Sequence, residues 1–466
     1  HLSIRRQRQM CIRDRIPPTA TLEQALESDP ELRRQAEEDE RVRRLLELAR
    51  KLEGVARNAS THAAGVIISR DPLTDHVPLT RGKDDVVMTQ YDMDSVAAIG
   101  LVKFDFLGLT NLTILDSALK IVERKRGQRI DLHRIPLDDA RTYELLGRGE
   151  TVGVFQLESA GMRRYLQELR PTSIQDIMAM VALYRPGPMA NIPAYIRRKH
   201  GLEPVTYLHP VLEPVLRETY GVMVYQEDIM TVAQAMAGYT LAEADVLCHA
   251  IRKKVLDKLL SQREKFERGA TERGIPKEVV DRVFEQFEPF ARYGFNRAHA
   301  ACYGLVAYYT AYLKANYPAE YMTAVLCADS GNLERIALDV EECRRMGIAV
   351  LPPDVNESEP EFTVVDDRTI RFGLGTIKNV GTSATQEIVR ARQQGGPFRS
   401  LADFCARTDG RVVTRKVVES LIKAGALDSL GDRAALLAGL DDALEYGARR
   451  QRREVSPQTG LFADCL

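Results

Sequence analysis

Lys103 and Asp105 stand in the stretch of sequence whose residue types point most directly to chemistry, the segment 100–108 (GLVKFDFLG). Because side chains alternate across a strand, Lys103 and Asp105 share one face, whereas Phe104 and Phe106 are predicted to face a core. A carboxylate on a rigid strand can bind Mg²⁺, and a neighbouring ammonium can bind a phosphate. These residues taken alone favour a simpler interpretation, an ordinary ion pair on a half-exposed strand.

A basic stripe is predicted on a second element, a helix over residues 244–253. His249, Arg252 and Lys253 fall at i, i+3 and i+4, so they share one helix face. Cationic side chains in this arrangement suit the phosphates of a triphosphate or a template, and a solvated basic face is the alternative. The opposite, apolar stripe comprises Ala244, Leu247, Cys248 and Ile251.

Asn296, Arg297 and His299 form a third polar group, directly before or at the start of a predicted helix. Polar groups at a helix start suit the binding of anions. Upstream, Gln226 and Glu227 could belong to a functional site, and a cap at the start of another helix explains them equally well. The apolar face expected for the helix after Asn296 comprises Cys302, Val306, Tyr309 and Leu313.

Residues 373–389 resemble a helix-hairpin-helix, with Lys378, Val380 and Gly381 at the hairpin. Such a tight turn offers backbone N–H groups to a DNA phosphate independently of base sequence. Asn379 stands where the first hairpin glycine is usual, and asparagine tolerates the left-handed backbone conformation. A second unit is predicted over 412–431, and plain helical turns are the alternative for both.

Length and composition restrict the protein class. The chain has 466 residues, 44% hydrophobic and 28% charged, with a formal net charge of -1. These values predict a globular protein of about three domains, without an apolar run long enough for a membrane span. The seven cysteines contain no C-x-x-C pair, which favours a reducing, cytoplasmic setting. Residues 1–15 look like a non-native leader, and a basic disordered arm is the alternative.

The predicted secondary structure around these groups changes from one part of the chain to the next. Residues 21–54 have helical periodicity, and residues 60–107 alternate in short segments that predict a small sheet. From about 110 to 350 the pattern is mostly helical. A linker at 351–354, a short β segment at 362–372 and two small helix pairs follow. The last predicted helix carries the basic run 449–453.

Several motifs, in order, resemble the bacterial DNA polymerase III α subunits, the C-family replicative polymerases. The segment Lys103–Leu109 (KFDFLGL) is similar to the palm motif of that family, and the resemblance covers residues 16–462. The other segments that carry it are 51–54, 61–66, 154–159, 182–188, 224–227 and 293–299.

The resemblance implies roles for individual residues. Asp105 matches a catalytic, metal-binding aspartate of a site for two Mg²⁺ ions, and Lys103 matches a lysine that contacts the incoming triphosphate. The nucleotide-binding set would further comprise His249, Arg252, Lys253, Asn296, Arg297 and His299. The family usually has two basic residues where Cys248 and His249 stand, and histidine is mostly neutral near pH 7.

Two expected parts of the family pattern do not occur in this sequence. The other two catalytic aspartates belong to a Pro-Asp-x-Asp-x-Asp-Phe segment, which is absent, as is the amino-terminal phosphoesterase-like domain. We therefore expect a fragment that starts inside the thumb and is inactive alone. Asp92 and Asp94 lie in a predicted loop and are a minor alternative to the missing pair. Neither Ser159 nor Cys302 has a recognisable base for a hydrolytic role.

The carboxy-terminal segment 458–462 (QTGLF) resembles a clamp-binding motif, in which Gln458 supplies an amide and Leu461 and Phe462 fill an apolar pocket. The partners implied are primer-template DNA, deoxynucleoside triphosphates, the sliding clamp and other replicase holoenzyme subunits, with no membrane.

The expected fold is α+β and mainly helical, with a remnant of a polymerase-β-like palm sheet, a large helical fingers domain and tandem helix-hairpin-helix units. The expected function is DNA-directed DNA polymerase. A non-catalytic DNA-binding and clamp-tethering module and an error-prone paralogue are the alternatives. The predicted domains are a partial thumb (16–59), the end of the palm (60–110), fingers (111–365), helix-hairpin-helix units (366–431) and the start of a clamp-binding region (432–466).

Overall fold

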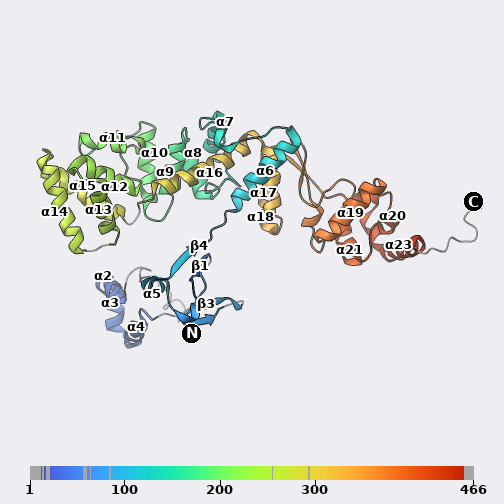
Figure 1. Cartoon of the computed structure of the whole chain (residues 1–466), viewed down its shortest axis with the longest axis horizontal. Helices are drawn as coiled ribbons and strands as arrows, with labels where there is room; N and C mark the ends of the chain where they lie inside the picture. Colours follow the sequence, from blue (N-terminus) through green and yellow to red (C-terminus); the bar gives the residue numbers. More distant parts are fainter. Residues whose placement is uncertain are drawn as a thin grey trace, which may run out of the picture. The chain divides into compact units, whose positions relative to one another are not determined.

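The computed structural model divides into two compact units, an amino-terminal unit over residues 1–108 and a carboxy-terminal unit over 109–466 (Figure 1). Both are rich in helices, and the sheets are small, so the predicted α+β, mainly helical fold is confirmed. The structure describes residues 12, 15–16, 21–55, 60–62, 64–82, 85–253, 256–291 and 294–455, without the side chains of 252–253, 256–259, 288–291 and 453–455.

The helical segment predicted over 21–54 is divided at two aspartates. Asp29 ends one helix and accepts backbone N–H groups at the start of the next, and Asp39 does the same ten residues later. An aspartate at such a position competes with the helix for backbone hydrogen bonds, which explains both breaks. The resulting helices are α2 (Leu22–Ser28), α3 (Pro30–Glu38) and α4 (Glu40–Leu52).

The described residues of 60–108 form two antiparallel ribbons instead of one sheet. β1 (Gly65–Ile68) pairs with β4 (Val102–Asp105), and β2 (Leu79–Arg81) pairs with β3 (Val87–Thr89). Helix α5 (Met93–Ala98) lies between β3 and β4, where the sequence predicted a loop.

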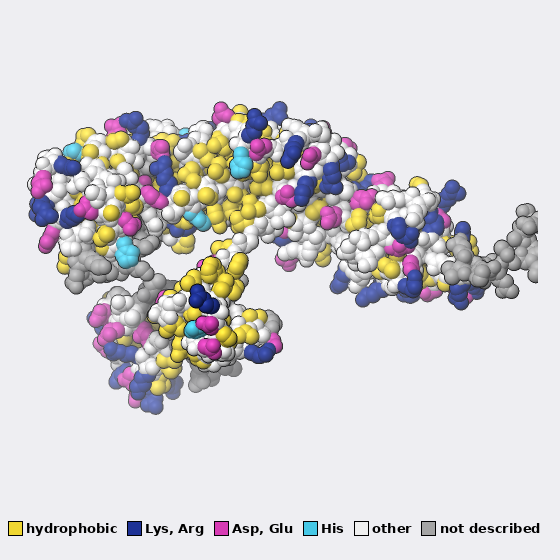
Figure 2. Space-filling model, in the orientation of Figure 1, with side chains coloured by type: hydrophobic (Ala, Val, Ile, Leu, Met, Phe, Trp, Pro, Cys, Tyr) yellow, Lys and Arg dark blue, Asp and Glu magenta, His cyan; other side chains and the backbone are white. Residues whose placement is uncertain are grey.

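The prediction that Phe104 and Phe106 face a core is wrong for this unit. Their exposed fractions are 47% and 66%, and Val66 and Val102 on the same ribbon are also exposed. Figure 2 shows hydrophobic side chains gathered over the β1–β4 ribbon. A two-stranded ribbon has two faces, and the described residues leave this one without a covering layer.

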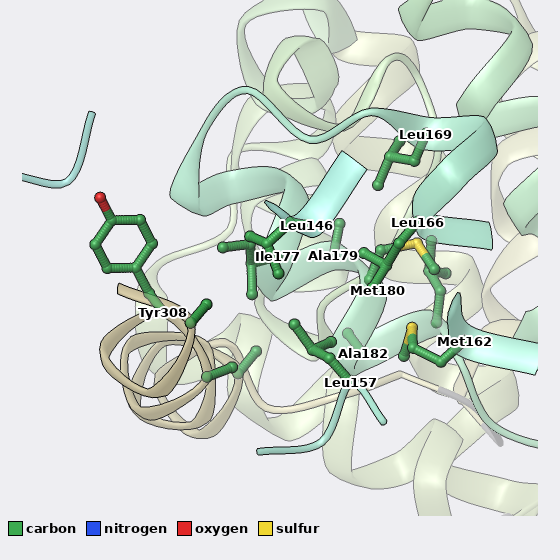
Figure 3. Close-up of a cluster of buried hydrophobic side chains, with 14 of the residues drawn as sticks. Leu146, Leu157, Met162, Leu166, Leu169, Ile177, Ala179, Met180, Ala182 and Tyr308 are labelled. Atoms are coloured by element: carbon green, nitrogen blue, oxygen red, sulfur yellow. The ribbon is translucent and has the colours of Figure 1, made fainter. Parts of the chain in front are cut away.

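The carboxy-terminal unit is built around α16 (Arg297–Asn316), which packs against α7 (Ala140–Gly147) and α9 (Ile174–Leu183). Figure 3 shows part of this core, with Ile177 of α9 and Tyr308 of α16. The elements around it are α6 (Thr110–Arg126), α8 (Ala160–Leu169), α10 (Ile192–Lys199), α17 (Pro318–Ala328) and α18 (Leu333–Arg345).

The apolar face predicted for α16 is only partly right. Leu313 is buried, but Cys302 is exposed, and the buried stripe passes through Ala307 and Tyr308 and includes Lys314. Lys314 is buried because its ammonium donates to two backbone carbonyls and forms an ion pair with Glu342. A charge can leave water when its hydrogen bonds are replaced in this way.

A second helical core follows along the chain and contains the aromatic cluster of Phe266, Phe284 and Phe287. These rings lie between α14 and α15, beside buried side chains of α12 and α13. The helices are α11 (Glu213–Leu216), α12 (Gln226–Ala237), α13 (Leu241–Lys253), α14 (Leu256–Glu272) and α15 (Lys277–Ala291).

The last part of the chain combines a small mixed sheet with short helices. β5 (Ala349–Leu351) lies parallel to β7 (Thr369–Arg371), and β6 (Thr363–Asp366) pairs with β7 on its other side. Leu351, predicted as part of a linker, is therefore in a strand. The helices are α19 (Thr382–Gly395), α20 (Leu401–Arg407), α21 (Arg415–Lys423), α22 (Arg433–Ala438) and α23 (Leu440–Val455).

Candidate functional site

Lys103 and Asp105 lie on one face of β4, as predicted from the alternation of the strand. Lys103 Nζ is 3.1 Å from Asp105 Oδ1, and both side chains are partly exposed. The ion pair is therefore present on a half-exposed strand, accessible to a ligand.

His62 belongs to the same group, although the sequence left its role open. Its Nδ1 accepts hydrogen bonds from the backbone N–H groups of Ala64 (3.1 Å) and Gly65 (2.7 Å). The same atom lies 3.9 Å from Asp105 Oδ1. Gly65 is the register partner of Asp105 across the β1–β4 ribbon, so the turn that His62 forms with Ala64 and Gly65 lies directly against this carboxylate.

The described residues do not make a complete two-metal centre. Among them, no group of three or more histidine, cysteine or acidic side chains is arranged to hold a metal ion. Two divalent cations need several carboxylates to fix their spacing. Asp105 is therefore suited to be one ligand of such a centre, and the full set is not formed by these residues.

The aspartates considered as a substitute pair have a local structural role. Asp92 is the N-cap of α5 and accepts a 2.7 Å hydrogen bond from the backbone N–H of Ser95. This hydrogen bond lowers the pKa of Asp92. Asp94 lies in the first turn of the same helix, where a negative charge is favourable.

Another group of predicted residues meets at a cavity of about 260 Å³ in the carboxy-terminal unit. His249 of α13 and Asn296, which precedes α16, line it together. The helix predicted over 244–253 is confirmed as part of α13, with Ala244 and Leu247 buried and His249 exposed. Arg252 and Lys253 belong to α13, but their side chains lie outside the described residues. The remaining lining residues are Gln226, Glu227, Met230, Asp245 and Cys248.

The loop before α16 is held by Gln226 and Glu227 at the start of α12. The Gln226 backbone N–H donates to the Phe295 carbonyl at 2.9 Å, and Gln226 Nε2 donates to the Gly294 carbonyl at 3.1 Å. Glu227 Oε1 accepts from Asn296 Nδ2 at 3.1 Å, and its Oε2 accepts from the Arg297 backbone N–H at 2.9 Å. These two residues therefore do more than cap their own helix, because they orient a segment about 70 residues away.

The start of α16 is already occupied by protein groups. Asn296 Oδ1 accepts from the His299 N–H at 2.8 Å, and Glu227 takes the N–H of Arg297. The expectation that this helix start binds an anion with free N–H groups therefore fails for these two donors, because side-chain oxygens already satisfy them.

The side chains of Arg297 and His299 remain at the surface of this loop. Arg297 Nη2 forms a 2.5 Å ion pair with Glu218 Oε2, and its guanidinium lies 5.4 Å from the centre of the Tyr225 ring. His299 stacks on Tyr303, with 4.0 Å between ring centres. The sequence analysis missed Glu218 altogether and named Glu227 only as a possible cap, because their contacts with Arg297 span 79 and 70 residues.

A buried carboxylate, that of Asp228, lies in the first turn of α12. Asp228 Oδ2 accepts from the backbone N–H groups of Val224 (2.7 Å) and Tyr225 (2.8 Å), and its residue is 5% exposed. Burial raises the pKa of Asp228 to about 6, although the two hydrogen bonds act in the opposite direction.

The hairpin at 378–381 has the expected backbone conformation. Asn379 has a φ of 70°, and its Nδ2 donates to Ser420 Oγ at 3.1 Å. The N–H of Val380 already donates to the Ile377 carbonyl, and its side chain is buried. Gly381 is the N-cap of α19 and provides no side-chain cap, and Lys378 is exposed. The donors open to a phosphate are therefore at the α19 start instead of at Val380.

The predicted clamp-binding residues Gln458, Leu461 and Phe462 lie outside the described residues. None of the described helices combines the length and the apolar character that crossing a membrane requires.

Comparison with known proteins agrees with the motifs. Residues 111–274 match the family model for the bacterial DNA polymerase III alpha subunit finger domain, and residues 2–108 match that for the bacterial DNA polymerase III alpha NTPase domain. Residues 347–436 match a helix-hairpin-helix motif.

Curated relatives named DNA polymerase III subunit alpha align with nearly the whole chain. The protein from Thermus aquaticus is 51% identical over 448 residues, which cover 95% of this chain and 37% of the relative. The protein from Escherichia coli (strain K12) is 45% identical over 96% of this chain and 40% of its own length. The protein from Caulobacter vibrioides is 46% identical over 95% of this chain and 39% of its own length. The chain thus spans less than half of each relative, and it belongs to the bacterial DNA polymerase III alpha family.

Proposed function

We propose that this chain is the part of a DNA-directed DNA polymerase that carries the fingers and one metal-binding carboxylate of the palm. The whole enzyme would add deoxynucleotides to a primer 3′ end with two Mg²⁺ ions. The observation that carries the proposal is the Lys103–Asp105 pair, accessible on β4. Asp105 would be one metal ligand, and Lys103 would bind the triphosphate.

The carboxy-terminal unit would supply the remaining nucleotide contacts. His249 and Asn296 line one cavity, and Arg297 and His299 lie in the first turn of α16, directly after Asn296. Because the N–H groups of Arg297 and His299 are already bonded, their side chains would bind the phosphates. Arg252 and Lys253 would extend this basic surface along α13.

DNA would be held by the helix-hairpin-helix units. The uncapped start of α19 presents backbone N–H groups next to the exposed Lys378, which suits a phosphate. The segment 458–462 would bind the sliding clamp, and other replicase subunits would assemble on the full enzyme in the cytoplasm. The predicted domains, from the partial thumb at 16–59 to the clamp-binding region at 432–466, belong to the same proposal.

A non-catalytic DNA-binding module is the second candidate for residues 1–466 by themselves. It is favoured because the residues that the structure describes form no complete carboxylate set with Asp105. The first candidate describes the polymerase that contains this chain, so both can be tested together.

The test compares residues 1–466 with the polymerase that contains them, in primer extension with Mg²⁺ or Mn²⁺. Residues 1–466 should bind primer-template DNA with an affinity that falls steeply with salt, and should add no nucleotide. The longer polymerase should extend the primer. Extension by residues 1–466 that is lost in Asp92→Asn or Asp94→Asn would overturn the assignment of the missing carboxylates, and a longer protein without extension would overturn the polymerase function.

A further inference from the structure

We infer that His62 is a positioning residue for Asp105, acting through the turn that leads into β1. The inference deepens the proposed polymerase function and rests on it. His62 itself would not contact metal or substrate. Its Nδ1 would set the backbone at Ala64 and Gly65, and this backbone would in turn fix where the Asp105 carboxylate lies.

The hydrogen bonds of the turn define the role of the imidazole. Nδ1 accepts from the N–H groups of both Ala64 and Gly65, so in this arrangement the ring proton is on Nε2. The Ala64 carbonyl accepts a 2.9 Å hydrogen bond from the N–H of Phe106, the residue after Asp105. The turn is therefore tied to His62 on one side and to the end of β4 on the other.

Gly65 is where the imidazole and the carboxylate meet. A Cβ at this position would lie 2.9 Å from His62 Nδ1 and 3.1 Å from Asp105 Oδ1, both closer than ordinary contacts. Only a glycine lets the ring and the carboxylate approach the same backbone. A movement of the ring would therefore change the space available to Asp105.

A direct bond between His62 and Asp105 does not explain the arrangement. His62 Nδ1 is 3.9 Å from Asp105 Oδ1, which is too long for a hydrogen bond. Both atoms act as acceptors, since Oδ1 takes the Lys103 ammonium at 3.1 Å. The imidazole stabilises the turn by accepting its two backbone N–H groups, and Lys103 forms the ion pair with the carboxylate.

The experiment compares His62→Ala with His62→Asn in the polymerase that contains this chain. An asparagine Oδ1 can accept the same N–H groups two and three residues ahead, so it restores the turn without an imidazole. His76→Ala, at an exposed histidine of the same unit, is the matched control. Gly65→Ala tests the close approach with His62 intact.

The first readout is hydrogen exchange in peptides that cover residues 62–68, which needs no catalysis. His62→Ala should lose protection there, whereas His62→Asn and His76→Ala should keep it. The second readout is the Mg²⁺ concentration for half-maximal primer extension, which should rise about 10-fold in His62→Ala and in Gly65→Ala. His62→Asn should stay near the wild-type value, and primer-template affinity should be unchanged in all variants.

Wild-type exchange in His62→Ala would overturn the inference, because the hydrogen bonds would then not hold the turn. A protected His62→Asn variant with the metal dependence of His62→Ala would also overturn it, since the imidazole would then be needed for itself. If the wild-type enzyme extends no primer, the proposed function fails, and the exchange experiment still decides the role of His62 in the turn.

Discussion

The Glu227 carboxylate accepts a 2.9 Å hydrogen bond from the backbone N–H of Arg297, across 70 residues of sequence. A carboxylate at a helix start is favoured by the helix dipole and replaces a missing intrahelical acceptor. Together with its bond to Asn296, this contact joins α12 to the loop that carries the predicted nucleotide-binding side chains.

Glu227→Ala should loosen this loop. We expect a loss of about 1–2 kcal/mol in the free energy of unfolding, together with a raised KM for deoxynucleotides in the polymerase proposed to contain this chain. Glu227→Gln keeps one side-chain acceptor, so its stability and its KM should lie between those of the wild type and Glu227→Ala. Glu278→Ala, in the first turn of α15, is the control. An unchanged KM in Glu227→Ala would show that the loop needs no such support.

Asp105→Asn should abolish primer extension in the polymerase proposed to contain this chain and leave primer-template affinity nearly intact. The amide removes the negative charge that a metal ligand needs and retains almost the same shape. Extension and fluorescence anisotropy measure the two quantities. Asp94→Asn should keep extension, because Asp94 lies at the start of α5. Substantial extension by Asp105→Asn would exclude a metal role.

Lys314→Met should destabilise the carboxy-terminal unit by about 3–5 kcal/mol, because it leaves the buried Glu342 with only Arg345, 3.6 Å away, as an ion-pair partner. Lys314→Met with Glu342→Leu should recover much of this loss, since no buried charge remains. Urea unfolding provides the free energies. The surface pair Lys120–Asp116 is a matched control, and Lys120→Met should cost less than about 1 kcal/mol. An equal loss in the single and double variants would contradict this account.

Asp228 should make stability depend on pH. Burial raises its pKa in the folded protein to about 6, above the value of about 4 in an unfolded chain. Between about pH 4 and pH 6 the folded state therefore keeps this proton, whereas the unfolded state has lost it. The free energy of unfolding should then decrease as the pH rises from about 4 to about 6. Asp228→Asn cannot titrate, so its Tm should show a smaller decline over that range. Parallel Tm profiles for the two proteins would refute the assignment.

A peptide of residues 455–464 should bind the sliding clamp. Replacing both Leu461 and Phe462 by alanine removes the two apolar anchors, and each such anchor is worth about 2 kcal/mol or more. Binding should therefore become undetectable by calorimetry. Gln458→Ala should weaken binding less, because the amide contributes hydrogen bonds alone. Equal affinity of the wild-type and double-alanine peptides would disprove the motif.

Relationships that depend on local periodicity can be predicted from the amino-acid sequence alone. Lys103 and Asp105 share a face because side chains alternate along any strand. The buried stripe of α13 follows from helical spacing, and the left-handed conformation of Asn379 follows from the turn it occupies. Motif order along the chain was also enough to recognise the family.

The atoms that meet across long sequence separations are evident from the folded chain and not from local patterns. His62 beside Asp105, Glu227 at the start of α16 and the burial of Lys314 against Glu342 each join distant segments. The exposure of Phe104 has the same origin, because alternation assigns a residue to a face and another layer must cover that face. Periodicity therefore specifies which side chains share a surface, whereas the partners of that surface depend on how the elements pack.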